Sequence, residues 1–446
     1  MAPFDLSSLR RLDQAHHLHP FTDHRAMHRE GTHIVRSAKG CTLTFEDGRE
    51  LLDGLAGLWC VNVGYGREEI AEAVAEQMRA VAFYPSFFNT TTEPTIRLAA
   101  RLAALAPARL NHSLFSNSGS EANETALKVI RGYWKLRGRR EKTKILARTF
   151  AYHGVTLATT SLTGLPTCTD PFDLPLPGFL QVPGPHAYGS GKSPTEYGVW
   201  CIEETQRVMA REGAGTIAAL FVEPVQGAGG VIVPPDGYLR ELRELCRRHE
   251  ILFVADEVIT GFGRLGAWFA SELWDLDPDL MTMAKGITSG YLPLGGVLIS
   301  GEIAAPFWAA PGGPVFRHGA TYAGHPTCCA AALANLDILE SENLIPRGRE
   351  LEGELMAALS PLADHPACGE IRGGLGLAAA VDLKPELLKE SPGALARLTA
   401  GSRAAGLLTR IQATGVGIGP PLVIEAAQLH EIAAGIRAGL DAALAG

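Results

Sequence analysis

The sequence predicts an α/β fold with a mostly parallel sheet flanked by helices, and three observations support this prediction. Residues 217–222 and residues 251–255 are uninterrupted apolar runs of strand length. The segment between them has a helical pattern whose apolar residues share one face, namely Leu239, Leu242, Leu245 and Cys246. Uninterrupted apolar strands separated by amphipathic helices are typical of a parallel sheet that helices cover on both sides.

Composition limits the classes of protein to consider. The chain has 446 residues, of which 46% are hydrophobic and 20% charged, which is typical of a globular protein with a large core. A formal charge of −8 gives no basic excess, so we expect no nucleic-acid partner. The longest apolar runs are too short to cross a membrane, and residues 1–6 lack the pattern of a secretory signal. The eight cysteines show no disulfide rhythm, so we expect a cytoplasmic protein.

The first third of the chain begins with short strands and continues with helices. Residues 41–45 are strand-like, and Asp-Gly turns follow at 47–48 and 53–54. A helical pattern begins at about Glu68. A second helix is expected over 95–105, with one apolar face formed by Ile96, Leu98, Ala99 and Leu102.

The remaining elements suggest a division into three parts. A short strand is expected at 145–147, and Asp236 is expected to cap the helix before residue 251. Residues 311–314 indicate a loop, after which residues 330–339 form an Ala/Leu-rich helix. We therefore expect a large domain over 71–326, and a smaller α+β domain built from the C-terminal segment 327–446 and the N-terminal segment 1–70.

Three predicted strands end in charged residues. The strand at 217–222 runs into Glu223, the strand at 251–255 into Asp256 and Glu257, and the strand at 279–284 into Lys285. Ligands of parallel α/β sheets bind at the carboxyl ends of the strands. Buried charges are costly unless they are paired or used. Two interpretations remain: a salt bridge at the sheet edge, or a site in which a lysine amine attacks a carbonyl while a carboxylate holds a cation.

A Ser/Gly-rich turn after another strand resembles a phosphate-binding cup. Leu114 and Phe115 lead into the sequence Ser-Asn-Ser-Gly-Ser at 116–120, and a helical stretch follows from Thr125. Free N–H groups, hydroxyls and the positive end of the helix dipole would all face an anion there. The same residues also suit an ordinary helix N-cap.

Two other patterns suggest ligands but are given structural interpretations. Residues 261–266 fit G-x-G-x-x-G, but they do not follow a strand directly, so we expect no nicotinamide site. The N-terminal histidines are His16, His17, His19, His24 and His28. We find no carboxylate or cysteine cluster at ligand spacing beside them, so we expect structural or solvated histidines and no metal site.

With these pieces placed, the sequence resembles the class III aminotransferases of pyridoxal-phosphate fold type I. The resemblance runs from about Asp13 to Ile424. Its most specific part comprises Phe253 to Val258, Thr260 to Arg264 and Ala284 to Gly286. The stretch from Asp53 to Trp59 is similar to the branch that uses pyruvate as amino acceptor, the ω-amine or β-alanine:pyruvate transaminases.

The resemblance implies pyridoxal 5'-phosphate as cofactor and a role for each matching residue. Lys285 would carry the cofactor and transfer the proton, and Asp256 would keep its pyridine nitrogen protonated, with Glu223 in support. Val258 and Tyr152 would sandwich the ring, while Gly119, Ser120 and, from the partner subunit, Thr321 would bind the phosphate. Trp59, Phe88, Tyr152 and Arg410 would contact the substrate, with Arg410 placed by its spacing from Pro420-Pro421.

The implied activity is a ping-pong transfer of an amino group from an amine or ω-amino acid donor to pyruvate, giving alanine. The implied assembly is a homodimer with shared active sites, or a tetramer built from it. Two positions depart from relatives: Ile259 replaces a glutamine, and Gln412 to Val416 replace a Gly-Asp turn. The alternatives are an aminomutase, a decarboxylase, an ornithine or 4-aminobutyrate transaminase, and a catalytically silent relative.

Overall fold

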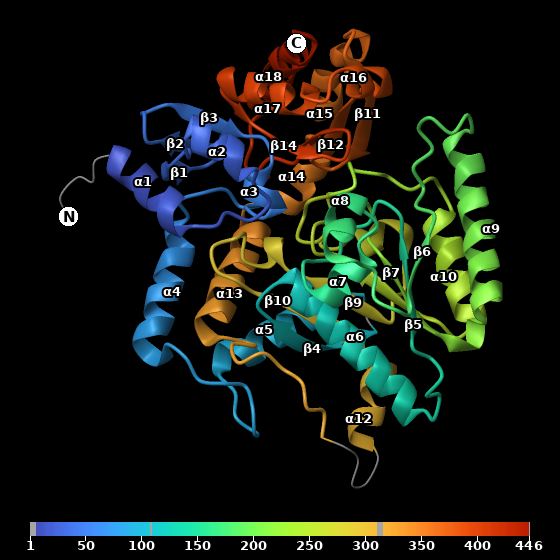
Figure 1. The fold of residues 1–446 in the computed structure, drawn as a ribbon. Coiled ribbons are helices and arrows are strands. Elements are labelled where there is room, and N and C mark those ends of the chain that lie inside the picture. The colour runs from blue at the N-terminus through green and yellow to red at the C-terminus, as the bar shows by residue number, and fades with distance from the viewer. Residues whose placement is uncertain (1–5, 108, 310–314, 446) are drawn as a thin grey trace.

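The computed structural model describes residues 6–107, 109–309 and 315–445 (Figure 1). The loop expected at 311–314 and the first five residues lie outside this range. Three sheets organise the chain, of seven, four and four strands. In the described residues, no helix is long and apolar enough to cross a membrane.

The seven-stranded sheet confirms the predicted mostly parallel α/β fold. Its spatial order is β4 (Leu110–Ser116), β10 (Gly295–Ser300), β9 (Leu280–Met283), β8 (Leu252–Asp256), β7 (Ile217–Val222), β5 (Lys144–Arg148) and β6 (Phe179–Val182). The strands from β9 to β6 pair in parallel. Only β10 runs the other way, antiparallel to both β4 and β9.

Helices cover both faces of this sheet, as the uninterrupted apolar strands predict. Phe221 and Val254 pack against α6 (Gly119–Leu136) on one face. The neighbouring residues Leu220 and Phe253 point to the other face, against residues of α9 (Pro194–Glu212) and α10 (Tyr238–Arg248). Further helices of this region are α5 (Glu93–Leu105), α7 (Leu157–Leu162), α8 (Pro166–Thr169), α11 (Gly301–Ala304), α12 (Pro306–Ala309) and α13 (Pro326–Ser341), with 3-10 turns η1 (Asp170–Phe172), η2 (Ala214–Thr216), η3 (Ala270–Trp274) and η4 (Lys285–Ile287).

The two smaller sheets lie at the top of Figure 1, where the N-terminal and C-terminal segments of the chain come together. One has the order β1 (Val35–Lys39), β2 (Thr42–Phe45), β3 (Glu50–Asp53) and β13 (Leu407–Leu408), so its last strand comes from the C-terminal region. The other has the order β11 (Cys368–Leu375), β12 (Ala378–Leu383), β15 (Gly415–Ile418) and β14 (Arg410–Gln412). The surrounding helices are α1 (Leu6–His16), α2 (His24–Glu30), α3 (Ala56–Trp59), α14 (Leu344–Glu350), α15 (Glu352–Leu359), α16 (Pro385–Glu390), α17 (Ala394–Ala404) and α18 (Ala426–Leu444), with the 3-10 turn η5 (Ser360–Asp364). Helix α4 (Glu68–Val81) extends away from these sheets and packs against α13 (Figure 1). The three-part domain division stays a prediction.

Two local expectations were wrong. Asp236 does not cap α10, because the helix begins after Gly237, whose left-handed backbone (φ 81°) closes the preceding turn. Ile96 does not belong to the buried face of α5 and is 58% exposed. The buried face of that helix is formed by Thr95, Leu98 and Leu102, which are spaced at three and four residues.

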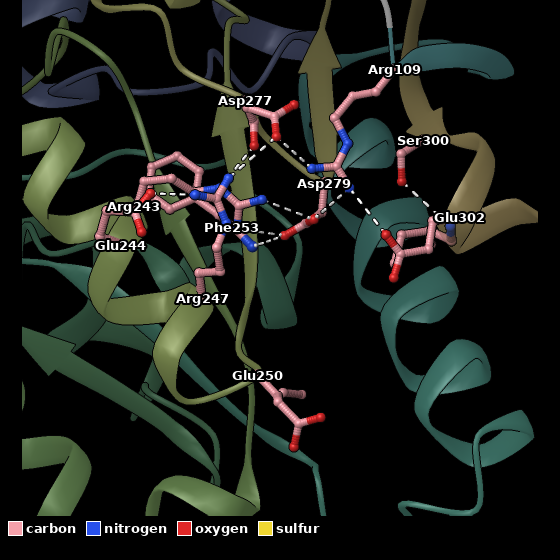
Figure 2. A network of polar contacts seen from close by, with 12 residues as sticks. Arg109, Arg243, Glu244, Arg247, Glu250, Phe253, Asp277, Asp279, Ser300 and Glu302 are labelled. Carbon is pink, nitrogen blue, oxygen red and sulfur yellow. Dashed lines mark hydrogen bonds and ion pairs between the residues drawn. The ribbon is translucent and has the colours of Figure 1, made fainter.

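A buried ion-pair network ties the amino ends of β8 and β9 to α10 (Figure 2). Asp279 accepts two hydrogen bonds from the Arg243 guanidinium, at 3.0 and 3.1 Å, and a third from the Phe253 N–H at 2.8 Å. Arg109 reaches the same carboxylate at 3.3 Å. The network lies at the end of β9 opposite Lys285, so it supports the sheet without taking part in the site.

Asp279→Ala is therefore expected to destabilise the fold by about 3–5 kcal/mol, because it leaves the Arg243 guanidinium buried without its carboxylate. Equilibrium urea unfolding followed by tryptophan fluorescence measures the change. Asp277→Ala is the matched control, since its side chain is 45% exposed, and it should cost less than about 1 kcal/mol. Equal losses in the two variants would contradict the role assigned to the Asp279 network.

Candidate active site

The carboxyl ends of neighbouring strands bring the predicted residues to one edge of the large sheet. In the register, Ala255 of β8 lies opposite Val222 of β7, and Asp256 lies opposite Thr282 of β9. Glu223 follows directly on β7, and Lys285 follows β9 after a single residue, Ala284. Ser116, at the end of β4, pairs with Gly295 of β10. The next residue of β10, Gly296, pairs with Met283 at the end of β9. The cup after β4 and the lysine after β9 thus share one edge.

Asp256 is a buried carboxylate held in place from three sides. One oxygen, Oδ2, accepts hydrogen bonds from Asn123 Nδ2 at 2.8 Å and from the His153 ring Nδ1 at 2.7 Å. The other oxygen, Oδ1, accepts the Val258 N–H at 3.1 Å and keeps further acceptor capacity. These bonds fix the carboxylate and leave Oδ1 as the atom available to a ligand.

The adjacent carboxylate, Glu257, serves the fold instead. Strand alternation turns it to the opposite face, where it accepts the N–H groups of Ala270 and Ser271 at 3.0 and 2.7 Å. The Thr260 and Ser271 hydroxyls also donate hydrogen bonds to the Glu257 carboxylate. Burial raises the pKa of Glu257, while these hydrogen bonds act to lower it. Asp256 therefore belongs to the site, and Glu257 stabilises the surrounding fold.

Lys285 lies in a tight turn immediately after β9. Its backbone is left-handed (φ 45°), and Asn335 Nδ2 holds the turn by donating to the carbonyls of Gly286 and Ile287 at 2.9 and 3.0 Å. Within the described residues, the Lys285 ammonium makes no hydrogen bond or ion pair. The salt-bridge interpretation of these strand ends therefore fails, because Asp256 is bound to His153 and Asn123 rather than to the lysine.

The Ser/Gly turn opens α6 directly, so the helix begins at Gly119, six residues before the expected start at Thr125. Ser118 is the N-cap, and its hydroxyl accepts the Glu121 N–H at 3.2 Å. A side chain at position 119 would place Cβ 2.9 Å from Val258 Cγ1, so only glycine lets the turn approach Val258 so closely. Ser120 Oγ accepts the Val155 N–H at 3.1 Å, which joins the turn to the loop after Tyr152.

Glu223 and Tyr152 form the adjoining wall. The buried Glu223 carboxylate accepts the backbone N–H groups of Tyr152 at 2.9 Å and Gly227 at 3.1 Å. Burial raises the pKa of Glu223, Asp256 adds to the increase, and His153 opposes it. Burial also raises the pKa of the Tyr152 phenol to about 12, so it stays neutral at physiological pH.

Trp59 is almost wholly buried. Its side chain is 2% exposed, its ring packs over Gly419, and the Arg264 guanidinium is 5.7 Å from the ring centroid. Arg264 is itself buried, which lowers its pKa to about 10, and it donates to Asn62 Oδ1 at 2.8 Å. A Cβ at position 286 would lie 2.7 Å from Asn62 Nδ2, so the Trp59 segment adjoins the Lys285 turn.

Arg410 is exposed on the edge strand β14, where its backbone pairs with Gly417. Its side chain makes no hydrogen bond or ion pair with the part of the chain that the structure describes. Burial raises the pKa of the nearby Tyr65 phenol, Asp53 adds to the increase and Arg410 opposes it. Tyr65 donates to Asp53 Oδ2 at 2.7 Å. The turn after β14 is tied down by Thr414, which donates to Asp382 Oδ2 at 2.8 Å.

Two predicted site residues lie outside this grouping within one chain. Phe88 is 93% exposed on the loop between α4 and α5, and Thr321 is exposed on the segment before α13. Both belong to one region, since the ring centroids of Phe83 and Tyr322 are 5.3 Å apart. A groove of about 780 Å³ runs between the two segments and is lined by Phe88, Val315 and His318 among others.

Sequence reasoning missed the residues that hold the site together. His153 and Asn123 hold Asp256, although Asn123 lies 133 residues before it in the chain. Asn335 and Arg264 fix the Lys285 turn and the Trp59 segment. The only sequence signals were indirect, because His153 follows Tyr152 and Asn123 lies one turn of α6 after Gly119.

The fold and this arrangement agree with the family comparison, and the chain belongs to the aminotransferase class III family, which matches residues 25–440. It is therefore a pyridoxal-phosphate-dependent transaminase with a fold of type I.

The individual relatives are transaminases as well. The chain is 42% identical over 439 residues to the putrescine–pyruvate aminotransferase of Pseudomonas aeruginosa, covering 96% of this chain and 95% of that protein. It is 37% identical to the diaminobutyrate–2-oxoglutarate transaminase of Halomonas elongata, over 90% of this chain and 88% of that one. Among solved structures, it resembles the (S)-enantioselective omega-transaminase of Thermomicrobium roseum with a TM-score of 0.94 and 42% identity, over 99% of this chain and 100% of that chain.

Proposed function

We propose that this transaminase moves an amino group from an amine or ω-amino acid donor to pyruvate and releases alanine, in a ping-pong cycle. The observation that carries the proposal is that the Lys285 amine, which has no partner among the described residues, lies at the strand-end edge that also holds the immobilised Asp256 carboxylate. The putrescine–pyruvate relative supports pyruvate as the acceptor. The 2-oxoglutarate-using relative makes 2-oxoglutarate the rival acceptor.

The residues present fit pyridoxal phosphate. The turn at Gly119 and Ser120 offers the free N–H groups of a helix start to a phosphate, and the contact between Gly119 and Val258 leaves no room for a side chain. Asp256 Oδ1 retains acceptor capacity for a protonated ring nitrogen. Val258 and Tyr152 would hold the ring, with Glu223 fixing the backbone of Tyr152. When bound, the cofactor supplies an electron sink for the carbon that loses its proton.

Lys285 would carry the proton transfers. In the holoenzyme its amine would attach the cofactor, and in the catalytic cycle the free ε-amine would take the proton from the amine-bearing carbon of the donor. The same nitrogen returns a proton in the second half of the cycle. The turn fixed by Asn335 limits the positions that this amine can reach.

Arg410 and Trp59 would select the substrate. A guanidinium binds a carboxylate with two parallel hydrogen bonds, and Arg410 is exposed and unengaged among the described residues. It suits the carboxylate of pyruvate or of an ω-amino acid, and it is free to turn away from an apolar amine. Trp59 would form the rigid back of the pocket, because its ring is held between Gly419 and Arg264.

The enzyme would work as a homodimer, on its own or within a tetramer, with Phe88 and Thr321 completing the partner's site. Both residues lie on exposed segments beside a groove whose rim carries large exposed apolar side chains, including Val315 and Tyr322. A surface of this kind suits a protein interface. The eight free cysteines favour a reducing compartment such as the cytoplasm.

The test supplies holoenzyme with pyruvate and a panel of donors (putrescine, β-alanine and 1-phenylethylamine), and measures alanine. We expect alanine equal in amount to the donor consumed. Alanine formation should exceed glutamate formation from 2-oxoglutarate. Loss of donor without alanine would contradict the proposal.

Arg410→Ala should separate the two kinds of donor. Because pyruvate also carries a carboxylate, the donor half-reaction is followed alone, by the absorbance of the bound cofactor. We expect kcat/KM to fall about tenfold to a hundredfold for β-alanine and to change little for putrescine, since one charge-assisted contact is lost. Arg437→Ala, on the exposed side of α18, is the control. Equal losses for both donors would remove Arg410 from the carboxylate site.

A further inference from the structure

Contrary to the expectation from the sequence, two of the N-terminal histidines have a carboxylate at ligand spacing. Asp13 on α1 lies among them, with Oδ1 3.2 Å from His17 Nδ1 and 2.9 Å from His19 Nε2. One ligand atom from each of these three residues lies within 4.8 Å of the others. The expectation was wrong because Asp13 and His17 are one helical turn apart, which is ligand spacing.

The local fold explains how His19 joins the other two. Helix α1 ends at His16, so His17 follows at the end of the face that carries Asp13. The chain then turns at Pro20 and Phe21, where Phe21 has a left-handed backbone (φ 51°). His24 Nε2 accepts the His19 N–H at 3.0 Å, which holds the loop against the start of α2.

The donor set and its spacing suit a first-row dication. Zinc–nitrogen and zinc–oxygen bonds are about 2.0–2.2 Å long, so neighbouring ligand atoms of a tetrahedral site lie roughly 3.3 Å apart. The 2.9 and 3.2 Å separations around Asp13 are close to that value.

A second cluster of potential metal ligands shows the contrast. His186, Glu370 and Asp382 also gather within ligand distance. There, however, Arg372 Nη1 already pairs with Glu370 and, at 2.8 Å, with Asp382. The Arg372 guanidinium therefore occupies that cluster. By contrast, no lysine or arginine among the described residues pairs with Asp13.

We propose that Asp13, His17 and His19 form a binding site for a zinc-class divalent cation, with two imidazoles, one carboxylate and water as ligands. The ion would tie the end of α1 to the loop that follows it. The site is separate from the transaminase chemistry, and without metal the same atoms form a hydrogen-bonded clasp.

The test titrates ZnCl₂ into holoenzyme that has been treated with chelator and dialysed, using calorimetry. We expect one tight binding event per chain that weakens at least tenfold in His17→Ala/His19→Ala and in Asp13→Asn. His430→Ala is the matched control, because His430 pairs with a single carboxylate, Glu354, at 3.0 Å and without a second histidine. Its zinc binding should equal that of the unaltered enzyme.

Thermal unfolding gives a second readout. Zinc should raise the unfolding midpoint of the unaltered enzyme and of His430→Ala, since a ligand that binds only the folded state stabilises it. It should not raise the midpoint of the two site variants, whose transaminase activity without zinc should be unchanged. Zinc affinity in the site variants equal to that of the unaltered enzyme, or no binding to any of them, would overturn the proposal and leave only the hydrogen-bonded clasp.

Discussion

The Lys285→Ala variant is expected to lose transamination by at least about a hundredfold to ten-thousandfold in kcat, because it removes both the cofactor attachment and the group that moves the proton. The Lys285 amine has no partner among the described residues, so its loss should break no contact that holds the fold. Steady-state kinetics with putrescine and pyruvate measures the effect.

Three further measurements separate chemistry from folding for Lys285. Borohydride treatment should link the cofactor to the unaltered enzyme and not to the variant. Lys285→Arg should be as inactive, since a guanidinium keeps the charge but does not lose its proton near neutral pH. Lys192→Ala, which removes an exposed lysine, should keep full activity. A Lys285→Ala enzyme within tenfold of normal kcat would exclude the assigned role.

Asp256→Asn should lower kcat by about a hundredfold to a thousandfold, the range seen when one electrostatic contact to the reacting system is removed. The amide has nearly the same shape as the carboxylate but lacks the charge that would keep the ring nitrogen protonated. The readouts are kcat and the absorbance spectrum of the bound cofactor, which should shift as the nitrogen loses its proton.

Asp275→Asn is the matched control for this variant, because Asp275 is exposed and has a left-handed backbone (φ 48°) that asparagine tolerates. Its activity and spectrum should not change. If Asp256→Asn lowered activity only through cofactor loss, saturating pyridoxal phosphate would restore kcat, and that result would reduce Asp256 to a binding residue.

The parts of the fold that the sequence predicts well depend on local patterns. The strands ending at Val222 and Asp256 are recognisable because the first is apolar throughout and the second is apolar up to Asp256, and the turn before α6 has a local Ser/Gly signature. The reversed strand β10 could not be predicted, since its direction depends on pairing with β4 and β9 rather than on its own residues.

The site divides in the same way. Lys285 and Asp256 stand at the ends of apolar runs, and Gly119 lies in a local Ser/Gly turn. Contacts between distant segments determine the roles of His153, Asn123 and Asn335. No spacing in the sequence therefore predicts these roles. His19 joins the Asp13 cluster only because the chain turns after α1, and no periodic pattern marks that turn.

The position of β10 between β4 and β9 has a consequence for biosynthesis. Ser116, beside the phosphate cup, pairs with Gly295, so the edge that holds the cofactor closes only after the chain has been made past Lys285. At ribosomal rates of about 5–20 residues per second, the cup emerges roughly ten seconds or more before its partner strand. During that interval the edge of β4 would be open to incorrect pairing. The complete edge is therefore available to the cofactor only after about two thirds of the chain has been made.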